Sequence, residues 1–217
     1  MLVTTLFKRP VLLWLSVIWL MVSFLSGCED SSQQRVSFEQ PYSQLLVYPD
    51  KNDIPGFTLS SAQGSEFSNE QLLGRWTLLF SGFTSCADVC PTTLTELTQL
   101  YKELPQELKP NFQIIFLSVD PARDSLPRIK DYLAYFHDDF VGITGDKDQI
   151  DTLIGALGGI YIINAEDPEF YTVDHSARIF IIDPQGRRFG MIIGSAMKAK
   201  DQSVLIKELT DMTTSVR

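Results

Sequence analysis

The stretch from Trp76 to Leu94, WTLLFSGFTSCADVCPTTL, joins an apolar run to a cysteine pair and to the start of a predicted helix. Trp76–Phe83 is almost continuously apolar, which is typical of a strand buried on both faces. Pro91 suits the first turn of a helix, where its missing N–H costs nothing. Cys86 and Cys90 therefore lie at a predicted strand-to-helix junction, where unpaired backbone N–H groups and the helix dipole favour thiolate over thiol.

The residues around this stretch predict alternating strands and helices. Apolar periodicity and turn residues predict a hairpin over 57–67, strands over 112–119 and 141–144, helices over 94–104, 126–136, 150–157 and 201–212, and a second hairpin over 178–193. A helix between successive buried strands implies parallel pairing, and the terminal hairpin is expected to add antiparallel edges. This order resembles the thioredoxin-like fold. We therefore expect an α/β fold with a central mixed sheet flanked by helices and an N-terminal hairpin.

The N-terminal residues have the pattern of a bacterial export signal. Lys8 and Arg9 are followed by the apolar run Val11–Phe24. The next residues, Leu-Ser-Gly-Cys28, resemble a lipobox, in which the cysteine is lipidated. The alternative is an uncleaved transmembrane anchor, but the apolar run is shorter than the roughly 20 residues that a spanning helix needs. Either interpretation ties the rest of the chain to a membrane, outside the cytoplasm.

Three parts follow from this pattern. We expect residues 1–27 to be a lipoprotein signal peptide, residues 28–44 to hold the lipidated Cys28 and a polar tether, and residues 45–217 to form one folded domain. The acidic residues directly after Cys28 favour the periplasmic side of the inner membrane. The formal charge is −9, and no stripe of lysine or arginine occurs, which excludes a nucleic-acid-binding protein.

The cysteine pair allows several kinds of chemistry. With Cys28 lipidated, Cys86 and Cys90 are the remaining cysteines, in a compartment where thiols are readily oxidised. A purely structural disulfide would close only a short loop and stabilise little. The redox motif of thioredoxins has two residues between its cysteines, whereas this pair has three, which places both on one side of a helical turn. Two thiolates would favour Cu(I) or Zn(II) and would leave room for a third ligand.

The chain has two histidines that could supply this ligand. His137 stands at the hydrophilic end of a predicted helix and needs no function there. His175 directly precedes the apolar strand predicted over 178–182. In a thioredoxin-like fold the loop that enters this strand lies beside the cysteine loop. His175 is therefore the candidate third ligand.

Three aspartates accompany these residues. Asp120 ends a buried strand and Asp174 precedes His175, so either could accept the second N–H of a metal-bound imidazole. For Asp120 the alternative is a turn-forming role before a proline. Asp124 follows an arginine in the same loop, and we expect this pair to brace the loop locally, without a functional role.

Three stretches, GFTSCADVCPTTL (82–94), FLSVDPARD (116–124) and VDHSARIFIIDPQG (173–186), resemble the signature motifs of the Sco/SenC family. Members of this family are copper-binding, thioredoxin-like proteins that assist the assembly of cytochrome c oxidase. The PGFTLSSAQG segment (55–64) is similar to the start of the family's domain. The resemblance spans about residues 54–213, with the motifs in the same order.

The resemblance implies a copper site made of Cys86, Cys90 and His175, which would hold Cu(I) or Cu(II). It implies a membrane-tethered copper chaperone for the binuclear copper centre of cytochrome c oxidase subunit II. The further partners expected are a periplasmic thiol reductant and a separate copper donor, since the methionines outside the signal peptide are few and dispersed. One position departs from the family, because Ala87 replaces its usual proline.

An enzymatic function is the alternative. Cys86 and Cys90 could form a redox-active disulfide in a periplasmic thiol–disulfide oxidoreductase or a peroxide-reducing relative. The spacing of the two cysteines favours a metallochaperone over an enzyme. The two functions overlap, since a dithiol that holds copper also exchanges disulfides.

Overall fold

The computed structural model describes residues 40–164, 172–175, 178–198 and 202–215. The predicted signal peptide and Cys28 lie outside these residues. None of the helices in the described ranges has the length and apolar character that a membrane span requires.

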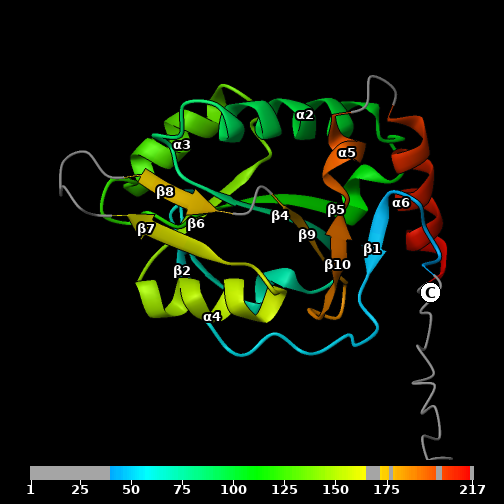
Figure 1. The fold of residues 1–217 in the computed structure, drawn as a ribbon, viewed down its shortest axis with the longest axis horizontal. Helices are drawn as coiled ribbons and strands as arrows, with labels where there is room; N and C mark the ends of the chain where they lie inside the picture. Colours follow the sequence, from blue (N-terminus) through cyan, green and yellow to red (C-terminus); the bar gives the residue numbers. More distant parts are fainter. Residues whose placement is uncertain (1–39, 165–171, 176–177, 199–201, 216–217) are drawn as a thin grey trace, which may run out of the picture. The chain divides into compact units, whose positions relative to one another are not determined.

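The centre of the fold is a mixed sheet with the strand order β1-β10-β9-β4-β5-β6-β2-β3. Strands β4 (Trp76–Gly82), β5 (Phe112–Ser118) and β6 (Val141–Thr144) run parallel. Every residue of β4 and β5 is buried, which confirms that their apolar runs form strands covered on both faces. Helices α2 (Val89–Glu103) and α3 (Leu126–Ala134) cover one face, and α4 (Lys147–Leu157) covers the other (Figure 1). The predicted thioredoxin-like α/β architecture is confirmed.

Antiparallel strands extend the sheet on both sides of this centre. Strand β9 (Ile179–Ile182) pairs with β4, and β10 (Arg188–Ile192) pairs with β9. The edge beyond them is β1 (Leu45–Val47), so the expectation that the terminal hairpin forms the edge is wrong. At the other side, β2 (Thr58–Ser61) and β3 (Glu66–Ser68) form the predicted N-terminal hairpin, which joins the sheet through β6.

The pairing of β7 with β8 was not predicted from the sequence. Strands β7 (Tyr161–Asn164) and β8 (Thr172–His175) pair with each other in a separate two-stranded sheet. In their register, His175 lies opposite Tyr161. His175 therefore ends a strand and does not lie in a plain loop. The apolar run over 160–163, which follows two glycines, could have indicated β7, although Ile162 is exposed in the structure.

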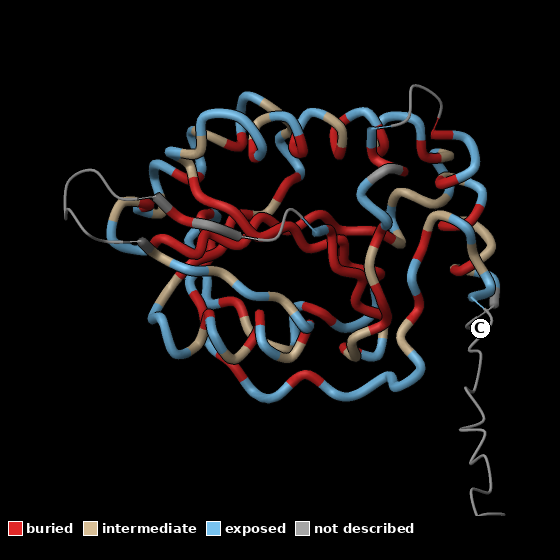
Figure 2. Tube along the Cα trace, viewed as in Figure 1, coloured by how far each residue is buried: buried red, intermediate tan, exposed pale blue. Residues whose placement is uncertain are grey.

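The remaining elements of the described residues are three short helices and the C-terminal helix. They are the short helices η1 (Asn69–Leu72), η2 (Lys109–Asn111) and α5 (Gly194–Met197), and the C-terminal α6 (Ser203–Ser215). Glu208 of α6 accepts hydrogen bonds from the backbone N–H and the hydroxyl of Ser43, both at 2.7 Å, and from the N–H of Gln44 at 2.9 Å. These bonds fasten the residues just before β1 to α6. The buried residues concentrate in the central strands and on the inner sides of the helices (Figure 2).

Candidate metal centre

The two cysteines meet at the junction of β4 and α2. Cys86 lies in the loop after β4, and Cys90 is the second residue of α2. The N–H of Cys90 has no partner within its own helix and donates to the sulfur of Cys86 at 3.4 Å. Asp88, the residue before α2, makes no side-chain cap, so the Cys86 sulfur is the acceptor at this helix start. The positive end of α2 therefore faces the sulfur, as the sequence predicted.

The two thiols differ in their exposure. Cys86 is half-buried, whereas Cys90 is fully buried against β4. A Cβ atom at Gly82 would lie 2.8 Å from the Cys90 sulfur, so a glycine is required where this sulfur packs on the strand. Burial raises the pKa of the Cys90 thiol, and a backbone hydrogen bond at Phe83 partly offsets this effect. The expectation that this junction favours the thiolate is therefore wrong for Cys90, because burial outweighs the helix start. Cys86 is thus the accessible thiol, and Cys90 is the fixed one.

The predicted third ligand is described only through its backbone. His175 ends β8, and nothing of its side chain or that of Asp174 is described, so their assignments stay predictions. The described residues contain no group of three histidine, cysteine or acidic side chains that could hold a metal ion. The structure therefore brings Cys86 and Cys90 together.

His137 has a packing role. Its ring lies 5.0 Å from that of Tyr101 and 5.3 Å from that of Phe140, between centroids, and its Nδ1 accepts the N–H of Asp139 at 3.2 Å. Tyr101 stands 11 residues after Cys90 on α2, which corresponds to about 16 Å along the helix axis. His137 is thus a partly buried histidine that packs on aromatic rings near the far end of α2.

Asp120 combines a turn with an ion pair. Its carbonyl accepts the N–H groups of Arg123 and Asp124, as the turn interpretation requires. Its buried carboxylate is bonded to the Nε of Arg123, whose guanidinium lies 5.5 Å from the ring centre of Phe83. The role of Asp120 in orienting an imidazole stays a prediction.

Two further residues near the cysteines were missed by sequence reasoning. The buried carboxylate of Asp124 accepts a hydrogen bond from Ser118 at the start of its own loop, as a local brace would, and it also bonds to Thr84 in the cysteine loop, which the sequence did not indicate. Tyr132 of α3 has a buried hydroxyl without a hydrogen-bond partner in the described part of the chain. Burial and then the neighbouring Cys90, Cys86 and Asp124 raise the pKa of this hydroxyl. For Asp124, the only signal in the sequence is its position in the DPARD stretch. For Tyr132, nothing in the sequence distinguishes it from any other aromatic residue on the buried face of a helix.

An apolar groove of about 470 Å³ opens beside the cysteine pair, between α2, α5 and the strands β9 and β10. Val89, which directly precedes Cys90, lines it and is 40% exposed. The surface next to the start of α2 therefore offers apolar and polar contact area.

Comparisons with known proteins agree with this architecture. The SCO1/SenC family model matches residues 49–213. A protein of Stutzerimonas stutzeri named for copper binding is 38% identical over 150 residues, which are 69% of this chain and 74% of the relative. The structure of Bradyrhizobium japonicum ScoI with copper bound is 30% identical, with a TM-score of 0.64, over 72% of this chain and 99% of that one.

A further solved structure has a lower identity and the same fold. BsSco, described as a member of the Sco family of cytochrome c oxidase assembly proteins, is 24% identical, with a TM-score of 0.60, over 78% of this chain and 98% of that one. The family model covers well over half of the chain, and it includes both cysteines and His175. The chain belongs to the SCO1/SenC family.

Proposed function

We propose that this chain is a membrane-tethered copper chaperone that holds Cu(I) or Cu(II) through Cys86, Cys90 and His175. It serves the maturation of the binuclear copper centre in cytochrome c oxidase subunit II. The observation that carries the proposal is the pairing of a fixed, buried Cys90 with an accessible Cys86 at the start of α2. Copper bound to the related Bradyrhizobium ScoI supports copper as the metal.

The donor set fits copper. Thiolates are soft ligands that favour Cu(I), and the positive end of α2 lowers the cost of placing negative charge on the Cys86 sulfur. An imidazole from His175 would complete a three-coordinate site and would make Cu(II) tolerable. Because Cys86 is accessible, a ligand of the acceptor site would replace Cys86 first when the copper is transferred.

The partners follow from this reaction and from family membership. The acceptor is subunit II of cytochrome c oxidase, in line with the oxidase-assembly description of BsSco. Both thiols must be reduced before Cu(I) binds, so a periplasmic thiol reductant and a copper donor are required. The predicted lipid on Cys28 would keep the domain at the periplasmic side of the inner membrane, close to the acceptor.

A competitive titration tests the proposal. The reduced full-length protein is titrated with Cu(I) against a chromophoric chelator, next to Cys86→Ser, Cys90→Ser and His175→Ala variants. His137→Ala is the matched control, because His137 is the second histidine of the chain and packs against aromatic rings. We expect one tightly bound Cu(I) in the wild type and in the control, and weaker binding in the three ligand variants. Equal affinity in His175→Ala and His137→Ala would refute the three-ligand site.

The exposure of the thiols also favours a second function, thiol–disulfide exchange. The accessible Cys86 thiolate would attack a partner disulfide, and Cys90 would then displace the partner thiol, so that two electrons and two protons pass and a Cys86–Cys90 disulfide forms. Reduction of an oxidised subunit II peptide by wild-type protein, lost in Cys90→Ser, would support this step. No transfer under conditions in which thioredoxin reduces the peptide would exclude it.

A further inference from the structure

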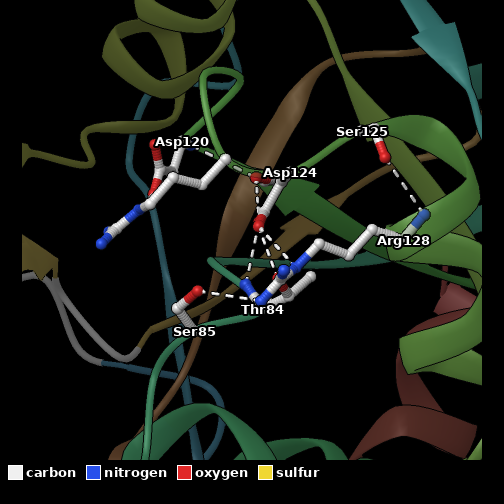
Figure 3. A network of polar contacts seen from close by, with 8 residues as sticks. Thr84, Ser85, Asp120, Asp124, Ser125 and Arg128 are labelled. Carbon is white, nitrogen blue, oxygen red and sulfur yellow. Dashed lines mark hydrogen bonds and ion pairs between the residues drawn. The ribbon is translucent and has the colours of Figure 1, made fainter. Parts of the chain in front are cut away.

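Asp124 lies at the centre of a polar network that reaches the cysteine loop (Figure 3). Its Oδ2 accepts the backbone N–H of Thr84 at 2.8 Å and the hydroxyl of Ser118 at 2.6 Å, while its Oδ1 accepts the hydroxyl of Thr84 at 2.5 Å. The side chain of Asp124 is fully buried, so these charge-assisted bonds are little weakened by water. Through them, the loop after β5 holds the loop after β4.

Arg128 forms the second arm of the network. Its Nε donates to the Thr84 hydroxyl oxygen at 2.6 Å and its Nη2 donates to the hydroxyl of Ser85 at 3.1 Å. Its Nε also lies 3.8 Å from Oδ1 of Asp124. Arg128 stands in the first turn of α3, where its N–H donates to the capping Ser125 at 3.4 Å. Thr84 and Ser85, which lead into Cys86, are therefore held by Asp124 in the loop after β5 and by Arg128 of α3.

We propose that Asp124 and Arg128 are positioning residues, which fix Thr84 and Ser85 so that the Cys86 sulfur stays at the start of α2, next to Cys90. This inference rests on the proposed copper function. Two sulfurs bind one ion strongly only when their separation is set before the metal arrives, because otherwise binding must also order the loop. Without the network, we expect the loop to be looser and copper to be held less tightly.

The charge of Asp124 by itself would act in the opposite direction. Burial is the main cause of the raised pKa of Cys90, and the negative charge of Asp124 adds to it, because a carboxylate disfavours a thiolate nearby. If Asp124 acted only through its charge, its neutralisation would strengthen Cu(I) binding. If it acts by positioning, the same change weakens binding. The sign of the change in affinity therefore separates the two roles.

The test compares Asp124→Asn with Asp183→Asn. Asp183 is a matched control, since it is also fully buried and accepts hydrogen bonds from Gln185 and Arg187, but in the β9–β10 turn. Both variants should lose stability. We expect the Cu(I) affinity in competition with a chelator to fall by about tenfold in Asp124→Asn and to stay unchanged in Asp183→Asn.

A metal-free measurement accompanies the titration. We expect amide hydrogen exchange in the reduced, copper-free protein to become faster over residues 84–90 in Asp124→Asn and to keep its wild-type rate there in Asp183→Asn. If Asp124→Asn does not fold, the same measurements are made on Thr84→Val and Thr84→Ser, because neither substitution changes the charge of the network. Thr84→Val loses the hydroxyl and should weaken binding, and Thr84→Ser should restore it.

The outcomes separate this inference from the proposed function. A wild type that does not compete for Cu(I) would refute the proposed function, and the exchange rates would still show whether the network orders the loop. Wild-type binding together with equal or tighter binding in Asp124→Asn, or equal binding in Thr84→Val, would overturn the positioning role alone.

Discussion

Gly82→Ala is expected to disturb the metal centre from the strand beneath it. The added Cβ would lie 2.8 Å from the Cys90 sulfur, 3.0 Å from Cε2 of Phe116 and 3.3 Å from Cε1 of Phe80. Ordinary contacts of a Cβ begin at about 3.4 Å, so the sulfur must move by at least 0.6 Å or the strand must shift. Phe80 and Phe116 are fully buried and cannot yield easily.

The expected cost is that of an overpacked core, about 1–3 kcal/mol of the free energy of unfolding. In a domain of this size, that corresponds to a fall in Tm of roughly 2–12 °C. Because the displaced atom is the fixed sulfur of the pair, the Cu(I) affinity should fall as well. Thermal unfolding followed by circular dichroism and a chelator competition measure the two effects.

Gly155→Ala is the control for this substitution. Gly155 is exposed in α4, and a Cβ there would meet nothing within 4 Å. Alanine is the better helix former, so this variant should gain about 0.5–1 kcal/mol and keep its copper affinity. A Gly82→Ala variant with wild-type Tm and wild-type affinity would refute the packing of the Cys90 sulfur on β4.

Three further variants test other parts of the structure. Tyr132→Phe removes a buried hydroxyl that has no hydrogen-bond partner in the described residues. The free energy of unfolding should therefore be unchanged or higher by about 1 kcal/mol. A clearly lower free energy of unfolding, measured in urea, would contradict this. Burial and the hydrogen bond to Asp151 raise the pKa of Tyr161 to about 12. The stability that this hydroxyl contributes is therefore fully present below its unfolded pKa of about 10 and is lost as the pH rises to 12. Between these pH values the free energy of unfolding should fall less in Tyr161→Phe than in the wild type. An equal fall in both proteins would contradict this. Glu208→Gln weakens the bonds that fasten the backbone before β1 to α6, so unfolding should become easier by about 1.5–3 kcal/mol, and wild-type stability would show that these bonds contribute little.

The sequence by itself determined the centre of the fold and the position of the cysteine pair. The apolar runs of β4 and β5 are long enough to identify strands buried on both faces, and the helices between them fix parallel pairing. The placement of Cys86 and Cys90 at the start of α2 followed from the same local pattern. These features depend on residues that are close in the sequence, and apolar periodicity and turn residues are patterns among such residues.

The tertiary structure decided what depends on residues far apart in the chain. Edge strand β1 and the β7–β8 hairpin became evident only from their pairing, β1 with β10 and β7 with β8. The contact of Asp124 with Thr84 spans 40 positions, and no local signal distinguishes it from a loop brace. Likewise, Gly82 looks like an ordinary strand end until the Cys90 sulfur is seen to pack on it. A side-chain hydrogen bond or a close packing contact requires atoms to meet in space, and only the folded chain brings these atoms together.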